Sequence, residues 1–401
     1  MSLQSHPLPA RARASERPSR EESPATGAPG NPILQFGTSR FLQAHVDLFV
    51  SEALARGEAL GGITVVQTTA SATSAARSAA LARGEGYEVR IRGLVDGRPV
   101  EASQRCHAVR AALHAQRDWL TLCEQVGSGV VQVIVSNTGD EGWQLDASDS
   151  AAMPAGEAPR SFPAKLLRLL AERWKRSPEA ALSVLPCELV ARNGDALRGL
   201  VLELARRWAQ PDAFIDYVAN QVLWANSLVD RIVSEALEPV GAVAEPYALW
   251  AIERRPGLVL PCAHPAIVLT DDLRRFERPK LHLLNLAHTF LAELWLRTER
   301  GSERTVVQAM NEPAYRDALE AVWRDEVLPV FGVWGLAGEA TDYLQSLRDR
   351  LLNPTLAHRL ADIAQNHAQK KARRLAPVVD EARASLPGLR QDRLSAALAS
   401  A

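Results

Sequence analysis

The 401-residue sequence has few cysteines, no excess of either charge and no long apolar run. Its four cysteines lie far apart without a Cys-x-x-Cys pair, which argues against a zinc site or a disulfide framework and favours a reducing cytoplasm. Lysine and arginine total 46 against 47 acidic residues, so the charge indicates neither a nucleic-acid nor a membrane partner. No run is long enough to cross a bilayer, and no secretion signal is evident. We expect a cytoplasmic monomer or small homo-oligomer that needs no metal and binds a small molecule.

The length of the chain exceeds one ordinary hydrophobic core, so two domains are expected. Residues 1–30 contain five prolines among Ser, Arg, Glu and Gly, with too little apolar surface to fold, and are predicted to be a disordered tail. Arginines in this tail would also suit an organelle transit peptide, but its glutamates have the wrong sign for one.

Short apolar runs predict a parallel sheet in the first half of the chain. Ile33–Phe36 ends at Gly37, a helical pattern follows from Phe41 to Phe49, and a second strand is expected at residues 63–66. Further buried strands are predicted at 130–135 and 182–185, and Asp96-Gly97 predicts a hairpin turn. Helical periodicity takes over from Leu197, and strand signals stop near residue 275. The simplest partition is a sheet-containing domain at 31–272 and an all-helical domain at 273–401.

One helix-patterned segment, Lys280-Leu-His-Leu-Leu-Asn285-Leu-Ala-His288, carries an amine, an amide and an imidazole among leucines. Pro279 suits the first position of a helix, so Lys280 is expected in the first turn, where the macrodipole would lower the pKa of its ammonium. Asn285 and His288 are three residues apart and share a face. The three groups form a general acid/base set, although ordinary polar residues on an amphipathic helix would look the same.

Polar residues follow the predicted strands where open parallel sheets bind ligands. Gly37-Thr-Ser39-Arg40-Phe41 holds only one glycine of a dinucleotide-binding turn, so a plain strand-to-helix turn is an equal alternative. Ser39 replaces the second glycine, and we expect Ser39→Gly to tighten cofactor binding by relieving steric strain. The polar residues that end the other strands are Gln67, Ser136, Asn137 and Thr138. The second predicted strand ends at Gln67, with neither the acidic residue that binds the ribose of NAD nor an obvious arginine for the phosphate of NADP. These residues therefore do not distinguish NAD from NADP.

At least six blocks, in order from about residue 33 to 377, resemble the polyol-specific long-chain dehydrogenases, the family of mannitol 2-dehydrogenase, fructuronate reductase and tagaturonate reductase. Lys280-x4-Asn285-x2-His288 is similar to the family signature, and Phe41, Gln43 and Ala44 match its first turn. Pro186-Cys-Glu-Leu resembles a block of the uronate reductases. Leu189 stands where mannitol dehydrogenases carry an asparagine, which favours the hexuronate branch or an oxyanion site that relies on Asn285.

The resemblance implies an α/β fold with a Rossmann-like NAD-binding domain followed by a helical C-terminal domain, with the active site between them. It implies reversible hydride transfer between NAD and an open-chain ketohexuronate, with tagaturonate favoured, fructuronate next and mannitol third. Lys280 would give a proton to the forming alkoxide, Asn285 would donate a hydrogen bond to it, and His288 would orient the hydroxyl.

The resemblance also suggests residues around the substrate. Asp230 would accept from its hydroxyls, Glu277 would relay protons to solvent, and His358 follows a matched Arg-x-x-Asn-Pro block. Arg350 and Lys370 are candidates to hold a carboxylate, although each could equally be a charge on a helix surface.

Two alternatives remain open from the sequence. A mannitol-1-phosphate type dehydrogenase shares the lysine helix but would need a basic phosphate pocket. A catalytically silent nucleotide or sugar-acid sensor on the same fold is suggested by Ser39 and by Gly139, which replaces a threonine of the family pattern.

Overall fold

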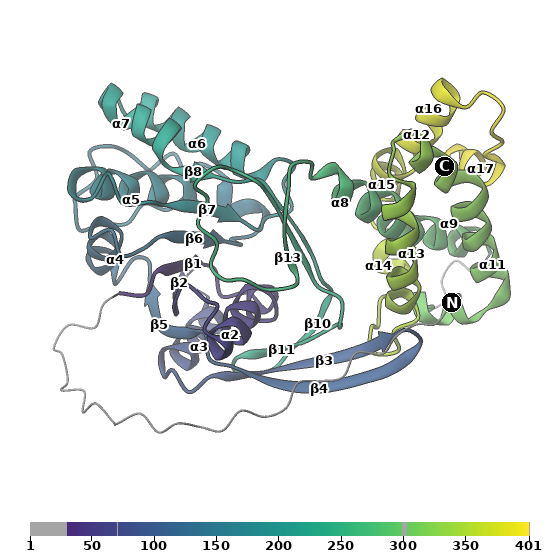
Figure 1. Cartoon of the computed structure of the whole chain (residues 1–401), viewed down its shortest axis with the longest axis horizontal. Helices are drawn as coiled ribbons and strands as arrows, with labels where there is room; N and C mark the ends of the chain where they lie inside the picture. The colour runs from purple at the N-terminus through teal and green to yellow at the C-terminus, as the bar shows by residue number, and fades with distance from the viewer. Residues whose placement is uncertain (1–29, 70, 299–302, 401) are drawn as a thin grey trace, which may run out of the picture.

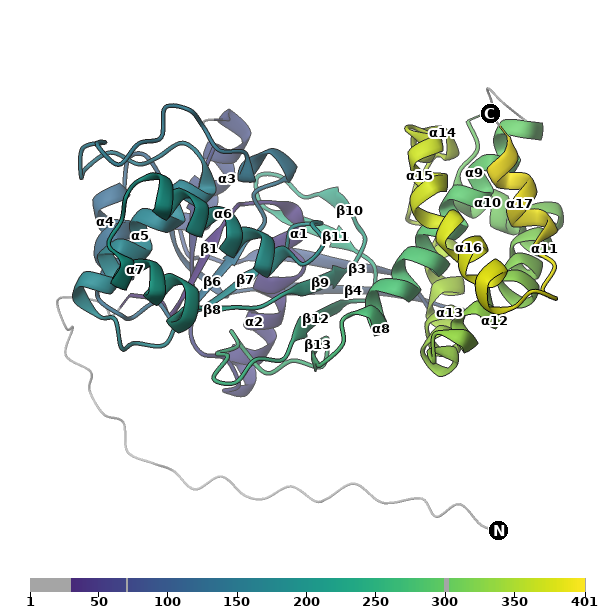
Figure 2. The same cartoon turned by 90° about the horizontal axis from the view of Figure 1, so that it is seen from above.

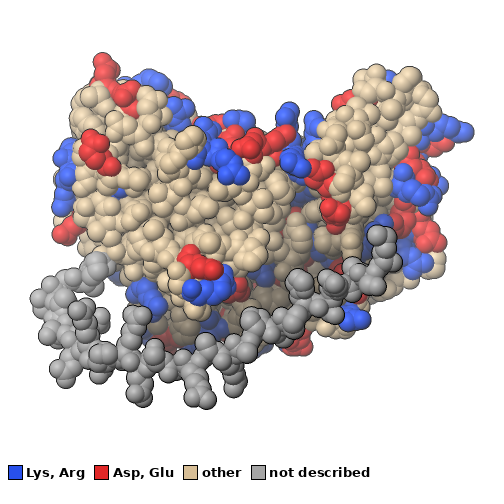
Figure 3. Space-filling view, viewed as in Figure 1, with Lys and Arg blue, Asp and Glu red and all other residues tan. Residues whose placement is uncertain are grey.

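The computed structural model describes residues 30–69, 71–298 and 303–400. The predicted tail at residues 1–30 therefore lies almost wholly outside the described residues. The rest forms two bodies side by side, one containing all three sheets and the other helical (Figures 1 and 2). Small patches of Lys and Arg lie near small patches of Asp and Glu on the face seen in Figure 3, in keeping with the balanced composition. Within the described residues, no helix is both long enough and apolar enough to span a membrane.

A six-stranded parallel sheet forms the centre of the first body, in the order β5-β2-β1-β6-β7-β8. Ile33 pairs with Ile63 on one side and with Val133 on the other, so the strand order reverses between β1 and β6. The six strands are β1 (Ile33–Phe36), β2 (Ile63–Gln67), β5 (Val109–His114), β6 (Val133–Ser136), β7 (Ser183–Pro186) and β8 (Leu223–Trp224). This reversal is a topological switch point, where open α/β sheets bind their ligands outside the carboxyl ends of the strands.

Both faces of this sheet are covered, which explains why its strands are mostly apolar rather than alternating. Leu34 and Phe36 join a core with α4, α5 and α6, whereas Ile33 packs into a second core with α2 and the small sheets. The helices of this body are α1 (Arg40–Gln43), α2 (Val46–Arg56), α3 (Ala72–Ala82), α4 (Trp119–Gly127), η1 (Asp140–Trp143), α5 (Phe162–Arg176), α6 (Asn193–Arg207), α7 (Asp212–Asp216) and η2 (Tyr217–Gln221).

Two small sheets lie between the large sheet and the helical body, in the orders β10-β11-β3-β4 and β13-β12-β9. Their strands are β3 (Tyr87–Val95), β4 (Arg98–Cys106), β9 (Ser227–Asp230), β10 (Val233–Ala236), β11 (Gly241–Ala244), β12 (Leu249–Glu253) and β13 (Ile267–Thr270). The β3–β4 hairpin extends beyond its sheet and reaches the helical body (Figure 1). There the Gly97 amide donates to Asp349 Oδ1 (3.0 Å), and Asn353 Nδ2 donates to the Arg92 carbonyl (3.2 Å).

The elements that follow β13 in the described part of the chain are helices packed around their own core. They are α8 (Arg274–Pro279), η3 (Lys280–Asn285), α9 (Leu286–Thr298), α10 (Val306–Asn311), α11 (Pro313–Ala321), η4 (Val322–Val327), α12 (Leu328–Val333), α13 (Ala337–Leu351), α14 (Leu360–Ile363), α15 (His367–Arg374), α16 (Ala376–Ser385) and α17 (Asp392–Ala399). The predicted fold class, a Rossmann-like α/β domain followed by a helical region, is confirmed.

Several predicted elements differ from the structure. Helical structure after Leu197 ends at Gln221, and the strands β8 to β13 with their connecting loops follow up to Thr270. These strands belong mostly to small sheets that are partly exposed, so their apolar runs are short and interrupted. The helix predicted from Phe41 to Phe49 is two helices, α1 and α2, with a break at Ala44 and His45. The strand predicted at 130–135 begins three residues later, at Val133.

Candidate active site

The carboxyl ends of β1 and β6 meet at the switch point through Gly37 and Asn137. Gly37 has φ +115°, and a Cβ atom there would lie 2.5 Å from the Asn137 carbonyl oxygen. Only glycine permits both this backbone conformation and this close approach. The single glycine that the sequence retains in the turn is therefore required to bring the two strand ends together.

Ser39 links the same strand ends by hydrogen bonds. Its hydroxyl accepts from the Leu42 amide (3.3 Å) as the N-cap of α1 and donates to Asn137 Oδ1 (3.1 Å). Asn137 Nδ2 in turn donates to the Cys187 carbonyl after β7 (3.0 Å). Ser39 has φ −66° and ψ 148°, an ordinary extended conformation. The expected steric strain at Ser39 is therefore absent, because the backbone is relaxed and the hydroxyl is used for capping.

Glu188 is hydrogen-bonded to the residues at the carboxyl end of β6, a role that the sequence analysis did not identify. Its buried carboxylate accepts from Ser136 Oγ (2.9 Å) and from the Thr138 amide (3.0 Å). Burial raises the pKa of Glu188, and these hydrogen bonds oppose that shift. Leu189 follows directly and is 70% exposed beside this edge.

The remaining residues predicted to contact a cofactor also lie at this edge. Arg40 is exposed at the start of α1, and Phe41 stacks on His45 with ring centroids 4.7 Å apart. Gln67 ends β2 and donates from Nε2 to the Thr69 carbonyl (2.7 Å). Arg77 of α3 donates to the Thr38 carbonyl (2.9 Å), which places near this turn a cation that the sequence analysis did not identify.

Lys280 lies inside a continuous helix rather than at its start. The helix begins at Arg274, and Pro279 is its sixth residue, so the predicted first-turn placement is wrong. The pKa of Lys280 is lowered as expected, but burial is the main cause, and Asp230 opposes the shift. Lys280 Nζ donates to the Val229 carbonyl of β9 (2.7 Å). The amine of Lys280, which belongs to the helical body, therefore contacts β9 of the first body.

A π-helical turn, η3, spans the segment from Lys280 to Asn285, and the Leu286 amide bonds back to the Leu281 carbonyl. In an α-helix, residues five apart point about 140° away from each other. The wider π turn reduces this angle, and such turns are frequent at functional sites. The π turn therefore brings the amine of Lys280 and the carboxamide of Asn285 toward a common face.

The side chains of Asn285 and His288 have no strong hydrogen-bond partner among the residues that the structure describes. The carboxamide of Asn285 makes no hydrogen bond to any residue that the structure describes, although its backbone carbonyl accepts from Thr289 Oγ1 (2.9 Å). The imidazole of His288 lies beside that of His358, with ring centroids 5.8 Å apart. Burial lowers the pKa of His288 to about 3, so this ring is neutral at physiological pH. Both groups are available to hydrogen-bond a neutral hydroxyl or carbonyl.

Arg350 is not available as a carboxylate anchor in this structure. Its Nε, Nη1 and Nη2 atoms make bidentate contacts to Asp230 and to Glu245 (2.9–3.0 Å). Nη1 also donates to Tyr343 Oη (3.0 Å), which accounts for all five N–H donors of the guanidinium. The Arg350 side chain is only 3% exposed. Its role in the structure is to join α13 to the small sheets.

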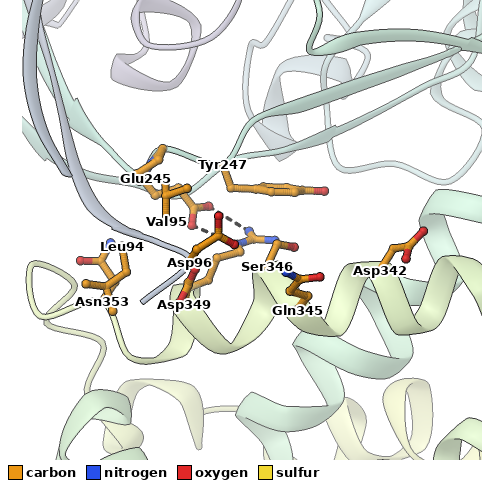
Figure 4. Close-up of a pocket in the computed structure, with 12 residues that line it drawn as sticks. Leu94, Val95, Asp96, Glu245, Tyr247, Asp342, Gln345, Ser346, Asp349 and Asn353 are labelled. Carbon is orange, nitrogen blue, oxygen red and sulfur yellow. Dashed lines mark hydrogen bonds and ion pairs between the residues drawn. The ribbon is translucent and has the colours of Figure 1, made fainter. Parts of the chain in front are cut away.

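Asp230 is buried in this same cluster. Burial alone would raise the pKa of Asp230, but Arg350 and Lys280 hold it below its usual value. A cavity of about 290 Å³ adjoins the cluster, between the hairpin tip at Leu94–Asp96 and α13. Figure 4 shows Glu245 and Tyr247 above α13, with Ser346 and Asp349 on the helix facing them.

Three other predicted site residues lie in the helical body. Glu277 is one turn before Lys280, partly buried, and burial raises its pKa. His358 has its pKa lowered by burial and by Arg350. Lys370 Nζ donates to the Ile363 carbonyl (2.7 Å). Arg374, which the sequence analysis did not select, contacts the helix that carries Lys280, Asn285 and His288, where it donates to Thr289 Oγ1 (3.0 Å). Arg374 does not stand out in the sequence because it lies within a run of basic residues, Lys370-Lys-Ala-Arg-Arg374.

Comparison with known proteins agrees with this architecture. Residues 31–258 match the model of the mannitol dehydrogenase Rossmann domain, and residues 272–401 match that of the mannitol dehydrogenase C-terminal domain. The chain is 30% identical to an altronate oxidoreductase of Klebsiella pneumoniae subsp. pneumoniae, covering 86% of this chain and 74% of that protein. It is 28% identical to an altronate oxidoreductase of Halalkalibacterium halodurans, covering 87% and 70%.

Two solved structures have the same fold. D-sorbitol dehydrogenase in substrate-free form superimposes with a TM-score of 0.73 at 18% identity, covering 92% of this chain and 79% of that one. The ternary complex of Pseudomonas fluorescens mannitol 2-dehydrogenase with NAD and D-mannitol gives a TM-score of 0.66 at 21% identity, covering 91% and 78%.

Proposed function

Because the chain belongs to the mannitol dehydrogenase family, we propose that this oxidoreductase interconverts a ketohexuronate and a hexonate, with tagaturonate and altronate as the favoured pair. Fructuronate is the second candidate and mannitol the third. The observation that carries the proposal is the partly buried amine of Lys280, bonded to β9, on the same helix as the carboxamide of Asn285 and the neutral ring of His288. The altronate oxidoreductases that resemble the chain support the choice of a sugar acid.

We assign NAD binding to residues 31–272 and substrate binding to residues 273–401. The donor set at the switch point fits a dinucleotide, because small polar side chains follow adjacent strands and an exposed arginine begins α1. The residues that would hold the cofactor are Gly37, Ser39, Arg40, Phe41, Gln67, Ser136, Asn137 and Thr138. When bound, the nicotinamide exchanges a hydride with the carbon that is oxidised or reduced.

Lys280 is assigned as the general acid in the reducing direction. Its ammonium gives a proton to the oxygen of the forming alkoxide, and the resulting amine takes the proton back when the alcohol is oxidised. Burial lowers the pKa of Lys280 and suits it to both tasks. The lowered pKa makes the ammonium a better acid for reduction and makes the amine needed for oxidation easier to form. Glu277, one turn away and partly buried, would pass the proton between Lys280 and solvent.

Asn285 and His288 position the reacting oxygen. The unpartnered carboxamide of Asn285 donates a hydrogen bond to the oxygen as negative charge develops on it. The neutral imidazole of His288 can donate from one nitrogen and accept at the other, so it can orient a hydroxyl without adding charge. His358 lies beside His288. Asp230, predicted from the sequence to accept from substrate hydroxyls, already accepts from Arg350 and Tyr343, so in this proposal it acts on Lys280 electrostatically.

The pH dependence should have opposite signs in the two directions. Reduction requires the ammonium of Lys280, so its kcat/KM should fall as pH rises through the lowered pKa of Lys280. Oxidation requires the amine, so its kcat/KM should rise through the same pKa. Steady-state pH profiles in both directions would measure this. Profiles that move together would assign the ionisation to another group.

Ser39→Gly should weaken cofactor binding rather than tighten it. The change removes the hydrogen bond to Asn137, worth about 0.5 to 1 kcal/mol, and thereby loosens the contact between β1 and β6. We expect the Kd for NADH to rise about two- to fivefold, measured by fluorescence titration. Tighter binding would instead support the steric explanation.

A substrate screen tests the proposal directly. NADH oxidation should be fastest with tagaturonate, slower with fructuronate, and slowest with fructose and fructose 6-phosphate. A preference for fructose 6-phosphate would favour the mannitol-1-phosphate type of dehydrogenase. NADH binding without turnover on any of the four would favour the catalytically silent sensor. Cytoplasmic location remains a proposal supported by the four free cysteines.

A further inference from the structure

Arg374 ends α15 and lies against η3 and α9, the helix of the proposed site residues Lys280, Asn285 and His288, called the catalytic helix below. Its Nη1 atom donates to Thr289 Oγ1 (3.0 Å) and to the backbone carbonyl of Asn285 (3.4 Å). The Arg374 carbonyl is also 2.9 Å from His282 Nδ1 of η3. Three residues of the catalytic helix therefore hold the backbone and one nitrogen of Arg374 in place.

The other edge of the Arg374 guanidinium is open. Nη1 carries two hydrogens, and the two contacts just described use both of them. Nε and Nη2 make no hydrogen bond to any residue within the described ranges. The side chain is partly exposed, and its charge persists because arginine does not deprotonate in proteins. A fork with a free Nε–Nη2 edge matches the two oxygens of a carboxylate.

The charge around Arg374 is also uncompensated. Lys370 lies one turn earlier on α15, and Arg374 contributes to lowering its pKa. No carboxylate in the described part of the chain forms a salt bridge with Arg374 or Lys370. Glu293, on the neighbouring helix α9, is occupied by His367, Lys371 and Arg297. By contrast, every donor of Arg350 is already used. The positive charge nearest the catalytic residues with donors to spare is therefore on α15.

We propose that Arg374 binds the carboxylate of the substrate through Nε and Nη2, with Lys370 adding a second positive charge. This inference rests on the proposed function, because it assumes a sugar-acid substrate. Arg374 touches the backbone of Asn285, so a carboxylate bound there is held at a fixed position relative to the carboxamide of Asn285 and the ring of His288. Arg374 thereby selects hexuronates over uncharged ketoses of the same length.

The test compares Arg374→Ala with Arg373→Ala, which removes the adjacent, exposed arginine. Arg374→Ala should raise the KM for tagaturonate about 10- to 100-fold, the factor expected for a charge-assisted hydrogen-bond pair, while kcat changes little. The KM for fructose should stay near that of the wild type. Added guanidinium ion should restore part of the tagaturonate activity of Arg374→Ala. Arg373→Ala should match the wild type on both substrates.

The outcomes separate this inference from the proposed function. Turnover of tagaturonate by the wild type, with equal losses on tagaturonate and fructose in Arg374→Ala, would overturn the role of Arg374 and leave the function standing. No change in Arg374→Ala would do the same. No hexuronate turnover by the wild type would overturn both. If Arg374→Ala has a lowered melting temperature, Arg374→Gln, which keeps a donor toward Thr289, replaces it and must show the same selective rise in KM.

Discussion

Lys280→Met should lower kcat for ketohexuronate reduction by at least about a hundredfold while leaving the Kd for NADH near its wild-type value. Methionine keeps the length and apolar stem of lysine but cannot carry a proton. The substitution also removes the hydrogen bond to the carbonyl of Val229, a residue of β9 and not of the turn that would hold the pyrophosphate. Steady-state kinetics with a parallel fluorescence titration of NADH would separate the loss of chemistry from a loss of binding.

Arg275→Met is a matched control on the same helix. Arg275 is exposed and pairs with Glu339, so its loss removes one cation from α8 without touching the buried cluster. We expect activity within about twofold of the wild type, because exposed ion pairs are worth little. Turnover of Lys280→Met within a few-fold of the wild type would exclude Lys280 as the acid.

Arg350→Met should destabilise the folded protein by about 3 to 5 kcal/mol, the usual effect of removing one partner from a buried ion pair. Asp230 and Glu245 would each lose a bidentate partner while remaining almost fully buried, at 4% and 1% exposure of their side chains. Urea unfolding followed by tryptophan fluorescence would measure the effect. The loss arises in the folded state, so it should be seen without substrate or cofactor.

Arg348→Met provides the comparison from the same turn of α13. Arg348 forms a partly exposed ion pair with Glu320, so its loss should cost no more than about 1 kcal/mol. Equal stability of the two variants would contradict the clamping role of Arg350. Unchanged stability of Arg350→Met combined with a selective rise in the KM for a hexuronate would restore Arg350 as the carboxylate anchor.

Features that depend on local patterns were predictable from the sequence. Short, mostly apolar runs predicted β1 and β2, because a strand covered on both faces is rich in apolar residues. Asp96-Gly97 predicted the β3–β4 hairpin, since these residues accept the positive φ of the turn. The shared face of Asn285 and His288 followed from their spacing of three residues, whereas Lys280 turns toward that face only through the π turn.

Features that depend on distant partners were not predictable. Arg350 looked available because its two carboxylate partners lie 120 and 105 residues earlier in the chain. Pro279 suggested a helix start, yet a helix that begins at Arg274 and widens into a π turn just after the proline accommodates it. Arg374 stood within a basic run, and only the packing of α15 against the helix of Asn285 and Thr289 distinguishes it from Arg373.

The docking of the β3–β4 hairpin on α13 has a consequence for how the protein is made. Asn353 and Asp349 bind backbone groups that precede them by 261 and 252 residues. During synthesis the hairpin can therefore dock only after most of the chain has emerged from the ribosome. β4 pairs with β3 along one side only and is the edge strand of its sheet before and after docking, the kind of surface that recruits other chains. Arg98, Glu101 and Arg105 place charges along β4. Those charges protect the nascent protein from aggregation as well as the finished one.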